Sequence, residues 1–217
     1  TMIDEVLDGN GFDPVTPIIR GLAYRNESLE VREQDLAKAE EHFRKAWGGA
    51  VWETGFQFTL LYNTGNSTRE TGARLMKEMV ESINPKFKID VRGMEWPGYL
   101  DARRNGRLPI QVTGWGADYP DPDNFAMPFM HSQGDFAGPH SYSNPEGDEI
   151  IEAARVETDP AKRQELYYRL QEIWIEDAPG VLWQGIVSRF HRDWVQGYVF
   201  HPQQDKEFLL APMSKGY

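Results

Sequence analysis

The hydrophobic positions between residues 56 and 113 change period in a regular order. Residues 56–61 and 108–113 are short, largely apolar runs, and residues 87–91 alternate apolar with charged side chains, as is typical of strands. Residues 68–83 place apolar side chains at helical spacing, and residues 96–105 predict a shorter helix. The order strand–helix–strand–helix–strand favours an α/β sheet with largely parallel pairing.

Three further helices are marked by capping residues. Asp35 precedes an amphipathic stretch, and its side chain is suited to cap the first turn. Asn144 and Asp159 are each followed by a proline, which is favoured at the first helical position. The predicted helices cover 35–47, 145–157 and 160–177.

The remaining segments carry weaker patterns. Residues 1–8 read as the end of a helix that is cut on its N-terminal side. Residues 9–34 are irregular and rich in proline and glycine, so we expect them to lie across a surface or an interface. Three other elements are expected: a short helix at 123–131 interrupted by Pro128, a fourth strand at 181–187, and extended pieces within 188–217.

Composition excludes several classes of function. The chain has 217 residues and no cysteine, which rules out disulfides, cysteine-ligated metals and thiol catalysis. Its net charge of −11, without a basic stripe, argues against a nucleic-acid partner. The five histidines lack metal-ligand spacing, and no apolar run approaches the ~20 residues that span a bilayer. No metal or cofactor is therefore expected.

The common catalytic and nucleotide-binding motifs are missing. The chain contains neither a Gly-x-Ser-x-Gly elbow nor a phosphate-binding P-loop sequence. Two Gly-x-Gly pairs, at Gly9 and at Gly114, begin a dinucleotide fingerprint, but Pro14 and Tyr119 occupy the positions of its third glycine. These absences favour a binding protein over an enzyme.

The segment 113–125 carries the most distinctive chemistry. It places Trp115 and three carboxylates directly after a predicted strand, together with two prolines and two glycines. Such a segment turns sharply and starts a helix, and it presents negative charge beside an aromatic ring. That combination suits a cationic or amine-bearing ligand.

The three carboxylates of this segment allow more than one interpretation. A calcium loop of the EF-hand type fails, because counting from Asp118 its sixth position is Asp123 and its twelfth is Phe129. Paired carboxylates of the glycosidase type are not excluded by spacing alone. Asp121 and Asp123 are otherwise expected to build the turn and cap the next helix, whereas Asp118 follows the strand end, where α/β proteins bind ligands.

Several segments resemble family 5 extracellular solute-binding proteins, the dipeptide-, oligopeptide- and nickel-type binding components of ABC importers. The sequence Gly-Trp-Gly-Ala-Asp-Tyr-Pro-Asp-Pro at 114–122 is similar to the signature of that family. Three other segments agree in order: Asp-Leu-Ala-Lys-Ala-Glu from Asp35, Tyr-Ser-Asn-Pro-Glu-Gly-Asp from Tyr142, and Asp-Pro-Ala-Lys-Arg from Asp159.

The resemblance implies an α/β fold that forms one lobe of a type II periplasmic-binding-protein-like fold, with a mixed sheet flanked by helices. Family members are longer and two-lobed, so the chain resembles the C-terminal part only. The implied division is a truncated helix with a surface or inter-lobe segment at 1–34, a ligand-binding lobe at 35–187, and a segment at 188–217 that returns toward the N-terminal lobe. The implied location is periplasmic or extracellular, with a lipid anchor possible through the missing N-terminus.

By this resemblance, the protein captures a solute between two lobes and delivers it to a membrane permease as a monomer. In peptide-binding members the aspartate of the signature holds the α-ammonium group, which corresponds to Asp118, and Trp115 lines a side-chain pocket. Tyr119 and Asn144 are further ligand-binding candidates. Dipeptide binders also use an arginine near the loop after the first strand, where this chain offers only Arg69, so dipeptide specificity is not expected. An oligopeptide is favoured, with an oligosaccharide or another solute as the alternative and a carboxylate-based hydrolase as a third.

Overall fold

A three-stranded parallel sheet forms the centre of the lobe. The computed structural model describes residues 2–30, 33–180, 183–186, 190–199 and 210–216. The strands are β2 (Phe56–Asn63), β3 (Phe87–Met94) and β4 (Ile110–Gln111), in the order β3-β2-β4. Leu60 of β2 pairs with Val91 on one side and Ile110 on the other. The predicted parallel pairing is confirmed.

Two helices make the crossovers that parallel strands require. Helix α3 (Ser67–Ile83) joins β2 to β3, and α4 (Trp96–Arg104) joins β3 to β4. The side chain of Asn66 caps α3 by accepting a hydrogen bond from the Arg69 amide. Ala73 on α3 is fully buried against Leu60 and Ile89, so the helical stripe read from the sequence does face the sheet.

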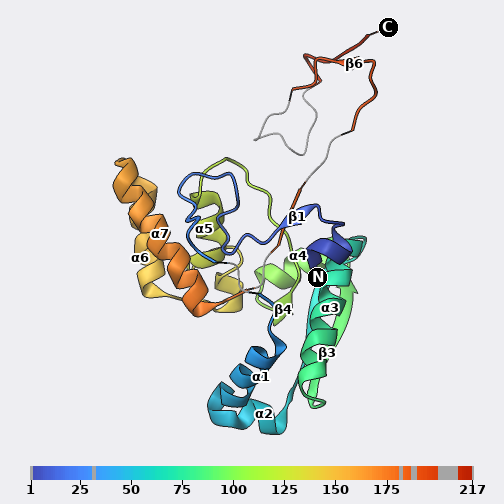
Figure 1. Cartoon of the computed structure of the whole chain (residues 1–217), viewed down its shortest axis with the longest axis vertical. Helices are drawn as coiled ribbons and strands as arrows, with labels where there is room; N and C mark the ends of the chain where they lie inside the picture. The colour runs from blue at the N-terminus through green and yellow to red at the C-terminus, as the bar shows by residue number, and fades with distance from the viewer. Residues whose placement is uncertain (1, 31–32, 181–182, 187–189, 200–209, 217) are drawn as a thin grey trace.

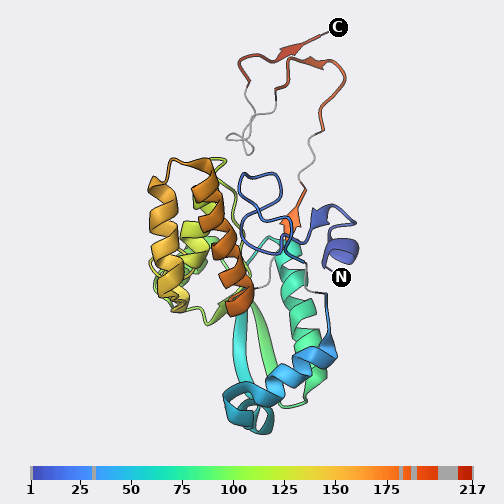
Figure 2. The ribbon, with the colours of Figure 1, turned by 60° about the vertical axis from the view of Figure 1, so that its left-hand side comes forward.

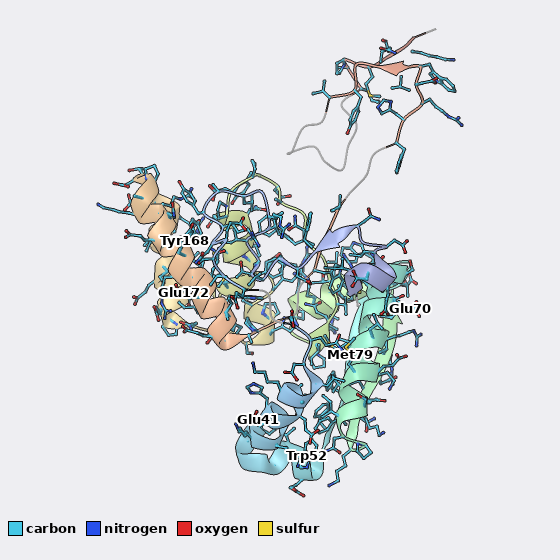
Figure 3. The ribbon with its side chains drawn as sticks, viewed as in Figure 1. Glu41, Trp52, Glu70, Met79, Tyr168 and Glu172 are labelled. Carbon is cyan, nitrogen blue, oxygen red and sulfur yellow. The ribbon has the colours of Figure 1, made fainter. Side chains whose placement is uncertain are left out.

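Two short helices joined by a 3-10 turn lie at the amino ends of the strands and form a corner of the lobe. Helix α1 (Leu36–Lys45) begins at Asp35, whose carboxylate accepts from the Lys38 amide, as predicted. A short 3-10 turn, η2 (Ala46–Gly49), follows, and the chain then forms α2 (Ala50–Thr54), which is too short to give a periodic signal in the sequence. Figure 3 shows Glu41 and Trp52 on this corner, at the opposite end of the sheet from the turn after β4.

A layer of three helices lies beside the sheet (Figures 1 and 2). It contains α5 (Asp123–Met130), α6 (Pro145–Val156) and α7 (Pro160–Asp177), with a 3-10 turn, η3 (Gly138–His140), between α5 and α6. Asn144 and Asp159 cap α6 and α7 through their side chains, as predicted. Met130, Ile151 and Leu170 are buried in the core between these helices.

Pro128 does not interrupt α5, contrary to the sequence prediction. The helix continues to Met130, with Pro128 in its last turn. A proline inside a helix removes the hydrogen bond to the carbonyl four residues earlier, which here belongs to Asn124. That carbonyl accepts instead from the indole N–H of Trp115, at 2.8 Å, and this bond outside the helix replaces the one that the helix lacks.

The irregular segment between residues 9 and 30 is more deeply buried than its proline- and glycine-rich composition suggests. Ile18 is fully buried in the core of the helical layer. Gln171 of α7 accepts hydrogen bonds from the Thr16 hydroxyl and the Asn26 amide. This part of the segment packs on α7, and buried polar side chains hold the irregular backbone there.

The last part of the chain does not extend the central sheet. The expected fourth strand lies partly outside the described residues, and its described part, β5 (Gln184–Gly185), pairs antiparallel with β1 (Gly11–Phe12). Strands β6 (Val195–Gln196) and β7 (Ser214–Lys215) pair with each other, away from the lobe (Figure 1). Antiparallel pairing among the described strands thus occurs in separate two-stranded sheets, while the central sheet is parallel.

The chain opens with a short π-helix, η1 (Met2–Val6), where the end of a helix was predicted. No helix of the described residues is both long and apolar enough to cross a bilayer.

Candidate ligand-binding site

The candidate site lies at the carboxyl edge of the parallel sheet. Strands β2 and β3 end at Asn63 and Met94, and the segment after β4 turns at this edge before α5 begins at Asp123. Ligands of α/β proteins bind outside the carboxyl ends of parallel strands. We define residues 113–123 as the acidic turn.

Asp121 holds the acidic turn to the helical layer. Its two carboxylate oxygens accept from the two terminal nitrogens of Arg163 on α7, each at 2.9 Å, and one of them also accepts from the Asp123 amide. Burial acts to raise the pKa of Asp121, but the Arg163 guanidinium and the Asp123 N–H outweigh it, and the net pKa lies below its ordinary value. Asp121 therefore builds the turn, as one interpretation of the sequence predicted.

Asp123 is likewise engaged within the protein. Its carboxylate accepts from the Tyr119 hydroxyl at 3.0 Å and lies 3.4 Å from the Arg155 guanidinium. The oxygen near Arg155, Oδ1, is buried and has no partner with hydrogen-bond geometry among the described residues. Neither Asp121 nor Asp123 thus presents a carboxylate that is free to serve as an acid, a base or a metal ligand.

Asp118 differs from the other two aspartates. Its side chain is exposed, and within the part of the chain that the structure describes its carboxylate has neither a hydrogen bond nor an ion pair. Its backbone is fixed, because the Asp118 amide donates to the side-chain oxygen of Asn124 at 2.9 Å. A free carboxylate on a fixed backbone is suited to bind a cation with little loss of conformational entropy.

Trp115 is held in one orientation by Asn124, the residue that also accepts from the Asp118 amide. Its indole N–H donates to the carbonyl of Asn124, and its ring contacts Phe136 and Phe129 edge to face, with centroids 5.7 and 6.5 Å away. Phe129 and Phe136 stack on each other at 4.5 Å. The ring is half-buried, so it presents one rigid aromatic wall at the edge of the sheet.

Tyr119 and Asn144 have less to offer a ligand. The ring of Tyr119 is 41% exposed, but its hydroxyl is engaged with Asp123. Asn144 uses its amide oxygen to cap α6 and its amide nitrogen to donate to Asp177 at the end of α7. Trp115, Asp118 and Tyr119 share the acidic turn, whereas no hydrogen bond or ion pair among the described residues joins Asn144 to it.

Arg69 also lies at this edge, although it was not among the ligand-binding residues expected from the sequence. Its guanidinium donates to Asn63 at the end of β2 and lies against Gly114, where a β-carbon would come within 2.6 Å of a guanidinium nitrogen. The side chain is half-buried, burial lowers the pKa of Arg69, and no carboxylate among the described residues pairs with it. Since arginine stays protonated under these conditions, a positive charge remains available at this edge.

A sequence signal for Arg69 was present. The residue stands three positions after the cap Asn66, in the first turn of a helix that follows a strand. In a parallel sheet that position lies at the carboxyl edge, near the acidic turn. Opposite charges thus meet at the same edge of the sheet: Asp118 on the acidic turn and Arg69 in the first turn of α3.

Similarity to known proteins identifies the family. A family model described as "Bacterial extracellular solute-binding proteins, family 5 Middle" matches residues 1–137. The chain belongs to this family.

Two relatives and one solved structure are similar to this chain. The periplasmic oligopeptide-binding protein OppA of Haemophilus influenzae is 27% identical over 195 residues, which make up 88% of this chain and 34% of that protein. Di/tripeptide-binding protein 4 of Pseudomonas aeruginosa is 27% identical over 219 residues, or 98% of this chain and 40% of that protein. The oligopeptide-binding protein AppA of Bacillus subtilis, solved with a nonapeptide, has a TM-score of 0.81 at 21% identity, covering 100% of this chain and 45% of that one.

The structural similarity confirms the predicted lobe of a periplasmic-binding-protein-like fold. The chain spans less than half the length of each of these three relatives.

Proposed function

We propose that this chain forms one wall of the ligand site in a peptide-binding component of an ABC importer. The observation that carries the proposal is the exposed carboxylate of Asp118, which is unpaired among the described residues and shares the acidic turn with the fixed ring of Trp115. This pair suits the α-ammonium group of a peptide and the apolar part of a neighbouring side chain. The names of the relatives, oligopeptide- and di/tripeptide-binding proteins, point to the same ligand class.

Capture would proceed by closure of a second lobe over this edge of the sheet. Closure removes water, and the attraction between Asp118 and an ammonium group grows as the effective dielectric constant falls. The closed form would then dock on a membrane permease. The full-length protein would act as a monomer outside the cytoplasmic membrane, without catalysing a reaction.

Arg69 extends the proposal to the other charge of a peptide. Its half-buried guanidinium has no carboxylate partner among the described residues, and it is suited to receive a ligand carboxylate in bidentate geometry. A ligand that carries both an ammonium and a carboxylate group would therefore use both charges of this edge. Tyr119 offers further ring surface, and Asn144 remains a candidate only if a longer ligand extends toward α6.

Two other functions fit the site less well. Trp96, 45% exposed and stacked on Tyr99 at 5.7 Å, begins α4 at the same edge and would suit the face of a sugar ring. A hydrolase would need a second carboxylate near Asp118, but Arg163 holds Asp121 and Tyr119 donates to Asp123. Peptide or glycoside turnover that is lost in Asp118→Asn would establish the hydrolase instead.

Calorimetry on the full-length protein tests the role of Asp118. A charge-assisted hydrogen bond contributes about 1.5–3 kcal/mol, so Asp118→Asn should weaken binding of trialanine roughly 10- to 100-fold. The mutation should leave the weaker binding of N-acetyl-trialanine nearly unchanged, since that peptide has no ammonium group. Glu149→Gln, which removes an equal charge from the exposed face of α6, is the control. Equal trialanine affinity in wild type and Asp118→Asn would remove Asp118 from the site.

A further inference from the structure

Asn124 connects the two side chains of the proposed ammonium site. It lies in the first turn of α5 and is almost fully buried. Its side-chain oxygen accepts from the Asp118 amide at 2.9 Å and from the Trp115 indole N–H at 3.3 Å, and its backbone carbonyl accepts from the same indole at 2.8 Å. One residue therefore fixes the backbone at Asp118 and the ring of Trp115.

The backbone carbonyl of Asn124 is available because of Pro128. In an uninterrupted helix the amide of residue 128 donates to the carbonyl of residue 124. Proline has no amide hydrogen, so the Asn124 carbonyl lacks its regular helical donor at residue 128, although the helix continues to Met130. A proline in a helix interior lowers helix stability, and here the freed carbonyl receives the indole of Trp115.

We infer that Asn124 and Pro128 are positioning residues for ligand recognition: together they fix the Trp115 ring and the backbone that carries the Asp118 carboxylate before the ligand arrives. This inference rests on the proposed function of the site. Neither residue needs to touch the ligand. Their effect is on how well the carboxylate is placed to distinguish an ammonium group from an uncharged one.

The two residues make distinguishable contributions. Asn124→Leu removes the acceptor for Asp118 and keeps the backbone carbonyl for Trp115. Pro128→Ala keeps the side-chain acceptor for the Asp118 amide. It adds an amide hydrogen at residue 128, which competes with the Trp115 indole for the Asn124 carbonyl. Asn124→Ser keeps an uncharged oxygen acceptor and is the conservative variant.

The experiment measures the preference of the full-length protein for trialanine over N-acetyl-trialanine, together with thermal stability. Asn124→Leu should reduce this preference about tenfold, and Asn124→Ser, which keeps an uncharged acceptor, should restore part of it. Pro128→Ala should raise the melting temperature, because alanine favours the helix, and still reduce the preference about threefold. A purely structural role predicts that stability and preference change in the same direction.

Asn84→Leu is the matched control. Asn84 is also a buried asparagine whose side chain binds backbone groups, accepting from the Lys86 amide and donating to the Trp52 carbonyl, but it lies at the far end of α3. Its replacement should lower stability and leave the peptide preference unchanged. An unchanged preference in both Asn124→Leu and Pro128→Ala would overturn the inference.

A measurement without ligand separates this inference from the proposed function. The Asp118 amide and the Trp115 indole N–H should exchange slowly with solvent in the wild-type protein, faster for the amide in Asn124→Leu and faster for the indole in Pro128→Ala. If the wild type bound neither peptide, the proposed function would fail and these exchange rates would still decide whether Asn124 and Pro128 fix the two groups. Rates equal to those of the wild type in both variants would overturn the positioning role.

Discussion

At the scale of single residues, what matters in the acidic turn is which partner each aspartate has. Asp121 faces Arg163, Asp123 faces Tyr119 and Arg155, and Asp118 has no partner among the described residues. The three carry the same charge, and a sequence alone does not show which charges are neutralised. The position of Asp118 in the segment that follows a strand end was the useful signal, because that location follows from topology.

Arg69 tests whether the ligand also presents a carboxylate. We expect Arg69→Gln in the full-length protein to weaken binding of trialanine about 10- to 100-fold, the range for a lost charge-assisted hydrogen bond. Binding of trialanine amide, which lacks the carboxylate, should change little. Calorimetry with both peptides measures this difference.

The control for Arg69 comes from the same helix. Arg74→Gln removes an exposed arginine of α3 that pairs with Glu70, and it should leave both affinities unchanged. If Arg69→Gln weakened the acid and the amide equally, Arg69 would support the structure of the site without binding a carboxylate.

At the scale of elements, the sequence predicted most of the lobe. The crossover helices and the helices that begin after Asn144 and Asp159 were correct, because capping and periodicity are local signals. The prediction for Pro128 was wrong, because a partner outside the helix, the Trp115 indole, uses the carbonyl that proline leaves free. The pairing of Gly11 with Gly185 was not predictable either, since it joins residues far apart in the sequence.

The contact between the acidic turn and α7 predicts an effect on stability. Asp121→Asn keeps an acceptor for the Asp123 amide but removes the charge that pairs with the partly buried Arg163. We expect a loss of about 1–2 kcal/mol in the free energy of unfolding at pH 7, measured by urea denaturation. Asp101→Asn, in the exposed pair with Arg107, should cost less than about 0.5 kcal/mol and is the matched control.

The same pair predicts a pH dependence with a definite sign. The pKa of Asp121 is lower in the folded protein than in the unfolded chain, where it is about 3.9. The Asp121 carboxylate therefore adds to the free energy of unfolding above that pH, and this stabilisation is lost as the pH falls through the folded-state pKa. The wild type should therefore lose stability between about pH 5 and the acid range more steeply than Asp121→Asn does. Parallel curves for the two proteins would mean that Arg163 does not stabilise the Asp121 carboxylate.

At the scale of the whole molecule, the lobe presents its charges on one open edge. Asp118 and Trp115 stand on the turn after β4, and Arg69 stands in the first turn of α3. In this chain the Asp118 carboxylate faces solvent, where an ion pair contributes only about 0–1 kcal/mol. The proposed closure would transfer the same pair to a water-poor cleft, where it contributes more.

This difference predicts that selectivity depends on the second lobe. The 217-residue chain alone should prefer trialanine over N-acetyl-trialanine by no more than a few fold, whereas the full-length protein should prefer it by 10-fold or more. Circular dichroism would first establish that the chain is folded, and calorimetry or NMR titration at millimolar peptide would measure the two affinities. If the folded chain alone kept the full preference, recognition of the ammonium group would reside within this lobe, and closure would serve only to retain the ligand.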